Sequence, residues 1–160
     1  MKKLIILRHG KTESKLGARD FERNLTAEGR KGVGSVATQL AKQKDWQPEL
    51  IIYSDAKRAQ QTKDIVVETL LDKNPEKTEH RLYSGDIEDI LNVLGEQAES
   101  LQTVMMIGHN PLLSMITSQL CGQDISLSTS DCVLLSKKMS SWDDILSKEP
   151  WELQEILKKL

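Results

Sequence analysis

The sequence predicts an α/β fold of three layers, in which helices flank a mostly parallel central sheet of about five to six strands. Short apolar runs rich in β-branched residues recur along the chain and are typical of strands buried on both faces of such a sheet. Segments with the apolar spacing of amphipathic helices lie between them. No repeat or linker interrupts this alternation, so we expect a single domain over residues 1–160.

The expected strands are apolar runs that stop at polar or charged residues. They cover residues 4–7, 50–53, 103–107 and 132–135, and a further, weak strand that includes charged residues is expected at 80–83. A run that is apolar throughout predicts burial on both faces, because alternate side chains of a strand point to opposite sides of the sheet.

Helices are expected in the intervals between the strands. One is predicted over about residues 26–44, where Thr26 is a good N-cap and apolar residues recur at i, i+3, i+4 and i+7. Others are predicted after Ser54-Asp55, after Asp86 and after Pro111, because these residues suit a helix start.

The two remaining segments are a polar stretch and the C-terminal tail. Residues 14–24 are expected to form a loop over the strand ends. After Pro150, leucine and isoleucine residues recur at helical spacing, so we expect a helix over about residues 150–160 that packs on the body of the domain. A loose helix that binds a partner is the alternative for this tail.

The composition is ordinary for a soluble protein and limits what the chain binds. The net charge is −2 with 29% charged residues, which provides no general basic surface for nucleic acid or an anionic membrane. No apolar run approaches the roughly 20 residues that span a bilayer, and no signal-peptide core opens the chain, so we expect a cytoplasmic protein. Cys121 and Cys132 form no CxxC pair and are expected to be reduced and structural. The three histidines lack a metal-ligand spacing, and we expect neither a metal nor another cofactor.

Charged side chains follow three of the predicted strands. Arg8 and His9 follow the first strand, Arg58 comes shortly after the second, and His109 follows the fourth. Ligands of open α/β sheets bind beyond the carboxyl ends of the strands, so parallel packing would bring two arginines and two histidines into one crevice. Gly10 lets the backbone turn or approach a ligand closely at this place.

This combination of side chains suits a phosphoryl group. Arginine matches phosphate oxygens bidentately and keeps its charge, and histidine can act as a nucleophile at neutral pH. Phosphoryl transfer needs little beyond an in-line nucleophile and positive donors around the equatorial oxygens. For Arg8 and His9 alone, a polar loop after a core strand is the simpler explanation, so the interpretation depends on the convergence of all four residues.

Four motifs, in this order, resemble those of the histidine phosphatase superfamily, which also includes the cofactor-dependent phosphoglycerate mutases. The motifs are Leu7-Arg8-His9-Gly10-Lys11-Thr12-Glu13, Leu25-Thr26-Ala27-Glu28-Gly29, Ser54-Asp55-Ala56-Lys57-Arg58-Ala59-Gln60-Gln61-Thr62 and Gly108-His109-Asn110-Pro111. The resemblance covers roughly residues 3–137 and implies a phosphoglycerate mutase-like fold. The compact length is most similar to that of the small SixA-type phosphohistidine phosphatases.

The resemblance implies a role for each matching residue. His9 would be the nucleophile that accepts the phosphoryl group, and the two arginines would hold its oxygens, with Gly10 also at the substrate-binding site. His109 would stabilise the group during its transfer. Ser54 and Thr62 match positions that would support the helix of the second arginine, which is a structural role.

One element of larger family members is missing from its usual place. Those proteins carry an acidic residue shortly after a leucine in the segment corresponding to 80–90, whereas Leu82 is followed here by Tyr83 and a serine. Asp86 is the candidate for a general acid, although helix capping explains it as well. A general acid contributes about 10²–10⁴-fold when an alkoxide must leave, but a protonated imidazole departs without one. The missing acid therefore favours phosphohistidine over a sugar phosphate as the substrate.

We therefore expect a metal-independent phosphatase that acts on phosphohistidine of a protein. A mutase is less expected, because those family members carry longer insertions than the 50 residues between Arg58 and His109. Two alternatives are left open: a phosphatase of a small ester, such as a sugar or nucleotide phosphate, and a non-catalytic phosphate-recognition module. The expected partner is a phosphorylated protein or a small phosphorylated substrate, with no nucleic acid and no membrane.

Overall fold

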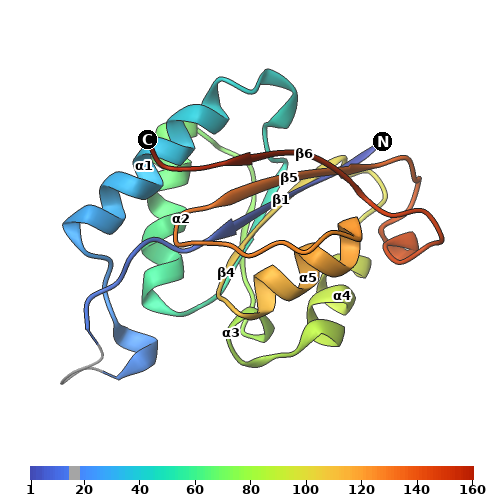
Figure 1. Ribbon diagram of the computed structural model, residues 1–160. Helices are drawn as coiled ribbons and strands as arrows, with labels where there is room; N and C mark the ends of the chain where they lie inside the picture. Colours follow the sequence, from blue (N-terminus) through green and yellow to red (C-terminus); the bar gives the residue numbers. More distant parts are fainter. Residues whose placement is uncertain (15–18) are drawn as a thin grey trace.

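The computed structural model describes residues 1–14 and 19–160, which form three layers with a six-stranded sheet in the middle (Figure 1). The strands are β1 (Lys2–Arg8), β2 (Leu50–Tyr53), β3 (Glu76–Thr78), β4 (Thr103–Gly108), β5 (Cys132–Lys137) and β6 (Glu152–Leu157). Their order across the sheet is β3-β2-β4-β1-β5-β6. The first four pair in parallel, and β5 is antiparallel to both of its neighbours. The expected α/β fold with a mostly parallel sheet is confirmed.

Helices cover both faces of this sheet. They are α1 (Ala27–Ala41), α2 (Lys57–Leu70), α3 (Arg81–Ser84), α4 (Ile87–Gly95) and α5 (Leu112–Cys121), with short 3-10 helices η1 (Asp20–Glu22), η2 (Lys44–Trp46) and η3 (Trp142–Asp144). α1 and α2 lie on one face, whereas α3, α4 and α5 lie on the other (Figure 1). In the described part of the chain, none of the helices has both the length and the apolar character needed to cross a bilayer.

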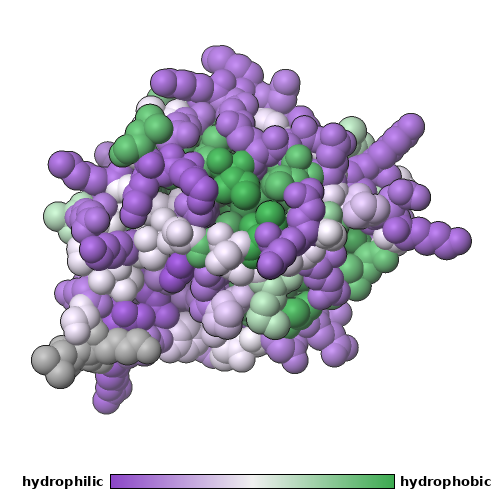
Figure 2. All heavy atoms as spheres, viewed as in Figure 1, coloured by the Kyte–Doolittle hydropathy of each residue, from purple (hydrophilic) through white to green (hydrophobic). Residues whose placement is uncertain are grey.

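Alternate side chains of the central strands pack into two separate cores. In β1, Leu4 and Ile6 belong to the core with α4 and α5, whereas Ile5 and Leu7 belong to the core with α1 and α2. The four residues are at most 1% exposed. The run is apolar throughout because helices cover both of its faces. The outer surface, in contrast, is mostly hydrophilic on the face shown in Figure 2.

The C-terminal segment is a strand, and the helix expected over residues 150–160 is wrong. β6 pairs antiparallel with β5 at the edge of the sheet, and Gln154 is an extra residue in this pairing. A bulge of one residue lets Leu153 and Ile156, three positions apart, pack against the same core, while Leu157 packs into the other. In the sequence, a strand with this bulge therefore has the same apolar spacing as a helix. Pairing with the open edge of β5 selects the strand conformation.

The weak strand expected at residues 80–83 is also wrong, because Arg81–Ser84 form the short helix α3 and His80 is its N-cap. The strand of this region is β3, three exposed residues that pair with β2. Leu82 of α3 is buried in the core, whereas Tyr83 faces a cleft. Four residues are too few for their pattern to distinguish helix from strand, and residues 76–78 pair with the edge of β2 instead.

The carboxyl ends of β1, β2 and β4 lie side by side. Arg8 pairs with Gly108, so β1 and β4 end level with each other. The next amides continue the ladder: His9 N–H donates to the Gly108 oxygen at 3.0 Å, and Ser54 N–H donates to the Ile107 oxygen at 3.0 Å. The register therefore brings the residues that follow three strands to one edge of the sheet.

Candidate active site

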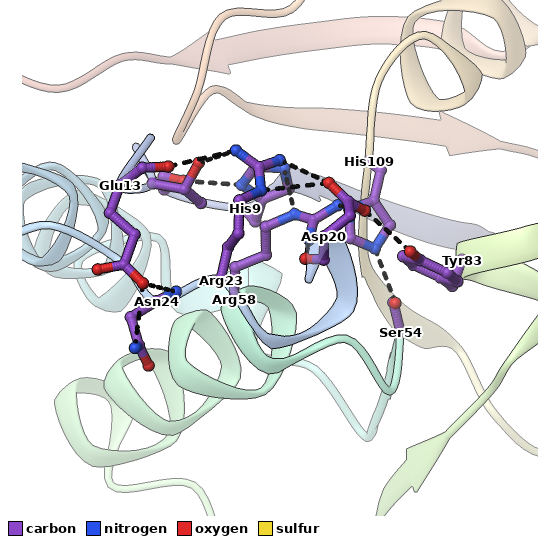
Figure 3. Close-up of polar contacts among 11 residues, drawn as sticks. His9, Glu13, Asp20, Arg23, Asn24, Ser54, Arg58, Tyr83 and His109 are labelled. Carbon is purple, nitrogen blue, oxygen red and sulfur yellow. Dashed lines mark hydrogen bonds and ion pairs between the residues drawn. The ribbon is translucent and has the colours of Figure 1, made fainter. Parts of the chain in front are cut away.

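His9 lies at this edge and is only 6% exposed (Figure 3). Its Nδ1 is 2.7 Å from the backbone oxygen of Gly10, which can only accept, so Nδ1 carries the hydrogen. The lone pair is then on Nε2, which accepts from Arg58 Nε at 3.4 Å. Burial and, to a lesser extent, the nearby arginine charges lower the pKa of His9 to about 4, although the bond to Gly10 opposes this shift. His9 is therefore a neutral imidazole of one tautomer at neutral pH.

Gly10 joins the end of β1 closely to α1. A Cβ at this position would lie 2.8 Å from both the Gly29 oxygen and Val33 Cγ2, so a larger residue does not fit. The Gly10 amide donates to Thr62 Oγ1 at 3.2 Å, and Thr62 donates to the Arg58 oxygen at 2.8 Å. This chain of bonds ties the strand end to α2. The substrate contact expected of Gly10 stays a prediction, since its amide hydrogen is already donated.

Arg58 lies in the first turn of α2 and is 5% exposed. Its Nη1 donates to the backbone oxygen of Asp20 at 2.7 Å, and its Nη2 donates to the carboxylate Oδ2 of Asp20 at 3.2 Å. Since its Nε faces His9, one guanidinium group connects the imidazole to the acidic residue (Figure 3).

Ser54 fixes the second imidazole of the site. Its Oγ accepts from the Ala56 amide at 3.2 Å and lies 2.7 Å from His109 Nε2. Ser54 is fully buried, and within the described residues His109 Nε2 is the acceptor available to its hydroxyl hydrogen. The hydroxyl therefore donates to Nε2, and His109 Nδ1 carries the ring hydrogen. We expected Ser54 only to support the helix of Arg58, and α2 in fact begins later, after its N-cap Ala56.

The Nδ1 hydrogen of His109 is an unused donor beside His9. Nδ1 is buried and has no hydrogen-bond partner within residues 1–14 and 19–160. The two imidazole centroids are 5.1 Å apart. Burial first, and then repulsion from His9 and Arg58, lowers the pKa of His109 to about 3. The second ring is therefore also neutral at neutral pH and presents one N–H group.

Arg8 supplies a second guanidinium group at the end of β1. Its Nη1 donates to the Leu127 oxygen at 3.0 Å, and its buried Nε has no partner among the described residues. Burial lowers the pKa of Arg8 and the charge of Asp131 opposes this shift. Arginine nevertheless stays charged, because its ordinary pKa is so high.

Asp20 is a carboxylate of the site that we did not expect from the sequence. Its Oδ1 pairs with Arg23 Nη2 at 3.0 Å, and its Oδ2 accepts from the Tyr83 hydroxyl at 2.8 Å. Burial would raise the pKa of Asp20, but the Tyr83 hydrogen bond and the charges of Arg58 and Arg23 outweigh burial and lower it to about 2. Asp20 is therefore ionised at neutral pH and cannot donate a proton.

These side chains line a cleft of about 580 Å³. Its described lining residues are Arg8, His9, Lys11, Thr12, Asp20, Arg23, Arg58, Tyr83, His109, Asn110 and Thr129. Within this set, four cationic side chains face one carboxylate, and both histidines are neutral. The cleft is therefore suited to an anion, and its buried arginine and histidine donors suit tetrahedral oxygens.

The structure brings together the four residues that were expected to be catalytic. Arg8, His9, Arg58 and His109 all line the cleft. Asp86 is not among its described lining residues. Its Oδ1 instead accepts the amide hydrogen three residues further on, at 3.0 Å, as the N-cap of α4. The general-acid role of Asp86 stays a prediction that no contact in the cleft supports.

Sequence reasoning missed Asp20, Arg23 and Tyr83 as residues of the cleft. The segment 14–24 was expected to cover the strand ends, so its charged residues were within reach of the site, but the sequence did not tell which of them would turn inward. Tyr83 was missed because its segment was assigned to a strand. Residues 15–18 of the expected loop lie outside the described residues.

Other chemical centres find little support in the described chain. In residues 1–14 and 19–160, no three histidine, cysteine, aspartate or glutamate side chains lie close enough together to hold a metal ion. Cys121 and Cys132 are buried free cysteines, and burial raises the pKa of the Cys132 thiol. Neither cysteine is among the described residues of the cleft.

The N-terminal half of the chain matches the family model of the histidine phosphatase superfamily, branch 1. The match covers residues 4–84, a span of 81 residues in a chain of 160. The chain belongs to the histidine phosphatase superfamily. The matched span contains Arg8, His9 and Arg58, and membership of this superfamily supports a phosphatase activity.

Two relatives of different kinds are similar to almost the whole chain. An uncharacterized chloroplastic protein of Arabidopsis thaliana is 29% identical over 172 residues, which are 98% of this chain and 77% of that protein. A proposed phosphohistidine phosphatase SixA from Agrobacterium tumefaciens has a TM-score of 0.84 at 24% identity, with 99% of both chains covered.

Other solved structures widen the range of substrates found with this fold. A protein histidine phosphatase SixA complexed with tungstate has a TM-score of 0.82 at 22% identity, covering 98% of this chain and 96% of that chain. A mycobacterial glucosyl-3-phosphoglycerate phosphatase has a TM-score of 0.70 at 17% identity, covering 99% of both chains. At these identities the likeness shows the histidine phosphatase fold.

Proposed function

We propose that this superfamily member is a metal-independent phosphatase that works through a phosphohistidine intermediate on His9 and removes the phosphoryl group from phosphohistidine of another protein. The observation that carries the proposal is the tautomer of His9. With its hydrogen on Nδ1 held by Gly10, His9 presents its Nε2 lone pair to a cationic cleft, and this lone pair can attack phosphorus once Arg58 Nε, which now donates to it, turns to the phosphoryl oxygens. The neighbouring guanidinium groups of Arg8 and Arg58 would hold the phosphoryl oxygens.

The reaction then needs two in-line steps. In the first, His9 Nε2 attacks phosphorus, the bond from phosphorus to the substrate nitrogen breaks, and its electron pair stays on that nitrogen. In the second, water attacks phosphorus and the bond to Nε2 breaks, with its electron pair returning to Nε2. Dihydrogen phosphate keeps both hydrogens of the water. The Nδ1 hydrogen of His109 would donate to a phosphoryl oxygen in both steps.

The acid–base properties of the cleft favour a nitrogen leaving group. Its described carboxylate, Asp20, is ionised at neutral pH, and both imidazoles are neutral. An alkoxide leaving group would need a proton donor, and its absence costs about 10²–10⁴-fold. A protonated imidazole ring leaves as a neutral molecule and needs none. Phosphohistidine is therefore the substrate class that these groups serve best.

Phosphate release from a histidine-phosphorylated protein and from p-nitrophenyl phosphate, measured side by side with a chelator present, tests the proposal. We expect the wild type to prefer the phosphohistidine protein and His9→Ala to lose both phosphate release and phosphoenzyme labelling. His80→Ala is the matched control, because His80 is an exposed histidine that pairs with Asp55 and is not among the described lining residues. The His80 ring lies 5.9 Å from the Tyr83 ring, so the decisive readout is phosphoenzyme labelling, which this variant should keep.

Four results would overturn parts of the proposal. Burst labelling in His9→Ala would remove His9 as the nucleophile. A preference for the ester would point to a small phosphate ester as the substrate, and no release from either compound would point to a non-catalytic phosphate-recognition module. Activity that disappears with the chelator and returns with a divalent cation would contradict metal independence.

A further inference from the structure

Asp20 is an unexpected neighbour for a phosphoryl group. It is the acidic residue among the described residues that line the cleft, and it lies against Arg58, one of the two arginines proposed to hold the phosphoryl oxygens. A carboxylate beside a dianion costs electrostatic energy, because the two charges repel. Its ion pairs position Arg58 and Arg23, but a neutral oxygen acceptor would position them without repelling the phosphoryl group. The position of Asp20 therefore needs an explanation in terms of the rest of the substrate.

The contacts of Asp20 hold its carboxylate at the border between the cationic site and an aromatic wall, which consists of the rings of Tyr83 and Phe21 (Figure 3). Arg58 and the Tyr83 hydroxyl both donate to Oδ2, and Arg23 pairs with Oδ1. The Tyr83 ring meets Phe21 edge to face, with centroids 5.0 Å apart, and meets the His109 ring in the same way at 5.5 Å. A ligand that extends outward from the phosphoryl site past Tyr83 therefore meets a flat apolar surface and an ionised carboxylate together.

A cationic, planar N–H donor is complementary to this border. An aromatic face attracts a cation, and a carboxylate accepts its hydrogen in a charge-assisted bond. When the guanidinium group of Arg58 donates to phosphoryl oxygens in place of Asp20, Oδ2 of Asp20 loses one of its two donors. It can then accept a hydrogen bond from another group. A phosphorylated imidazolium ring carries both groups that the cleft can bind: a phosphoryl group on one nitrogen for the arginines, and an N–H on the other nitrogen for Asp20.

We infer that Asp20 is a specificity-determining residue, which accepts a hydrogen bond from the unphosphorylated ring nitrogen of a phosphohistidine substrate; this inference rests on the function proposed above. The bond favours the protonated ring. When the bond between phosphorus and nitrogen breaks, the electron pair stays on the leaving nitrogen, the N–H hydrogen stays on the other nitrogen, and a neutral imidazole departs. For an ester, the leaving oxygen gains negative charge, and the same carboxylate repels it.

Asp20 thus acts in opposite directions on the two kinds of substrate, and this difference provides the test. We would measure kcat/KM of the wild type and of Asp20→Asn for a phosphohistidine peptide and for p-nitrophenyl phosphate. Hydrogen bonds to charged groups contribute about 1.5–3 kcal/mol, so we expect the phosphohistidine value to fall by about 10-fold or more. The value for the ester should stay the same or rise.

Two further variants separate this role from a structural one. Asp55→Asn removes a carboxylate that pairs with His80 and is not among the described lining residues, so the preference between the substrates should not change. Tyr83→Phe removes one donor to Asp20 and keeps the ring and the charge, so it tests the same site if Asp20→Asn does not fold. Because the Tyr83 hydroxyl fixes the orientation of Oδ2, its loss should lower the preference for phosphohistidine, but by less than Asp20→Asn does.

The failure of the inference is distinguishable from the failure of the proposed function. A wild type that does not release phosphate from the phosphohistidine peptide contradicts the proposed function. A wild type that prefers this peptide, together with an Asp20→Asn variant that loses activity on both substrates equally, contradicts the inference alone. In that case Asp20 would serve only to hold Arg23 and Arg58 in place.

Discussion

Ser54→Ala offers a direct test of how the second imidazole is held. The substitution removes the hydroxyl that lies 2.7 Å from His109 Nε2 in a fully buried position. Without that donor, no bond fixes the ring hydrogen on Nδ1, so the other tautomer becomes populated, and in that tautomer Nδ1 presents a lone pair to the phosphoryl oxygens. Loss of one preorganised donor to developing negative charge costs about 10²–10³ in kcat. We expect a fall of this size in kcat.

The same substitution also has a cost in stability. A buried polar atom that loses its partner costs about 1–3 kcal/mol in the free energy of unfolding. In a chain of this size, Tm falls by about 2–4 °C for each kcal/mol. Thr117→Val is a matched control, because Thr117 is equally buried and donates to the Leu113 oxygen at 2.7 Å within α5, and it is not among the described lining residues.

Steady-state kinetics and thermal unfolding of both variants together separate the two effects. The control should lose Tm and keep kcat, whereas Ser54→Ala should lose both. Imidazole nitrogen chemical shifts of His109 should also report the change of tautomer. If the kcat of Ser54→Ala equals that of the control, the bond from Ser54 does not position the imidazole, and the assigned tautomer is unnecessary for turnover.

Three other substitutions or conditions give further tests. Arg58→Lys should lower kcat/KM for any phosphorylated substrate strongly, because a point charge does not reproduce a bidentate fork; near-normal kinetics would remove Arg58 from the site. The free energy of unfolding should fall as the pH drops from about 6.5 toward 4. In this range the two histidines His9 and His109 become protonated in the unfolded chain but stay neutral in the folded protein. Thermal unfolding of His9→Gln should show a shallower fall across this range, and an unchanged slope would contradict the lowered pKa. Leu157→Ala should lower the free energy of unfolding by about 2–5 kcal/mol in denaturant titrations, since Leu157 is 3% exposed. Leu160→Ala is the control and should change nothing, because Leu160 is fully exposed. Equal effects of the two substitutions would argue against the packing of β6 on the core.

The electrostatics of the cleft give the site an unusual division of roles. Burial removes the positive charge from both histidines, while the arginines keep theirs because of their high ordinary pKa. The imidazoles therefore serve as nucleophile and neutral donor, and the guanidinium groups serve as anion binders. This division follows from the ordinary pKa values and not from depth, because Arg58 is 5% exposed and His9 is 6% exposed.

The central strands and the four core site residues could be predicted because their signals are local. A run such as Leu4 to Leu7 is apolar on both faces only when helices cover both sides of a sheet, and the alternation of such runs with amphipathic segments predicts the layers. Parallel strands place their carboxyl ends at one edge, so Arg8, His9 and His109 were expected to meet without any knowledge of the loops.

The contacts that complete the site could not be predicted, because they join segments far apart in the chain. Asp20 and Tyr83 are separated by 63 positions, and Ser54 and His109 by 55. The period of a sequence carries no information about which side chain of a loop or of a short helix turns inward. Asp86 is different, because the helix that it caps was expected from the sequence, and its carboxylate accepts an amide hydrogen of that helix start.

The sequence by itself determined the α/β layering and the motif residues at the strand ends, because both depend on local patterns and on the common direction of parallel strands. The same local motifs indicated the superfamily. Only the tertiary structure decided the conformation of the tail, where helical spacing and a bulged strand share one apolar pattern and the open edge of β5 selects the strand. It also decided the protonation of the imidazoles and the place of Asp20. Burial and opposing charge set a pKa, and both arise only when distant segments pack together.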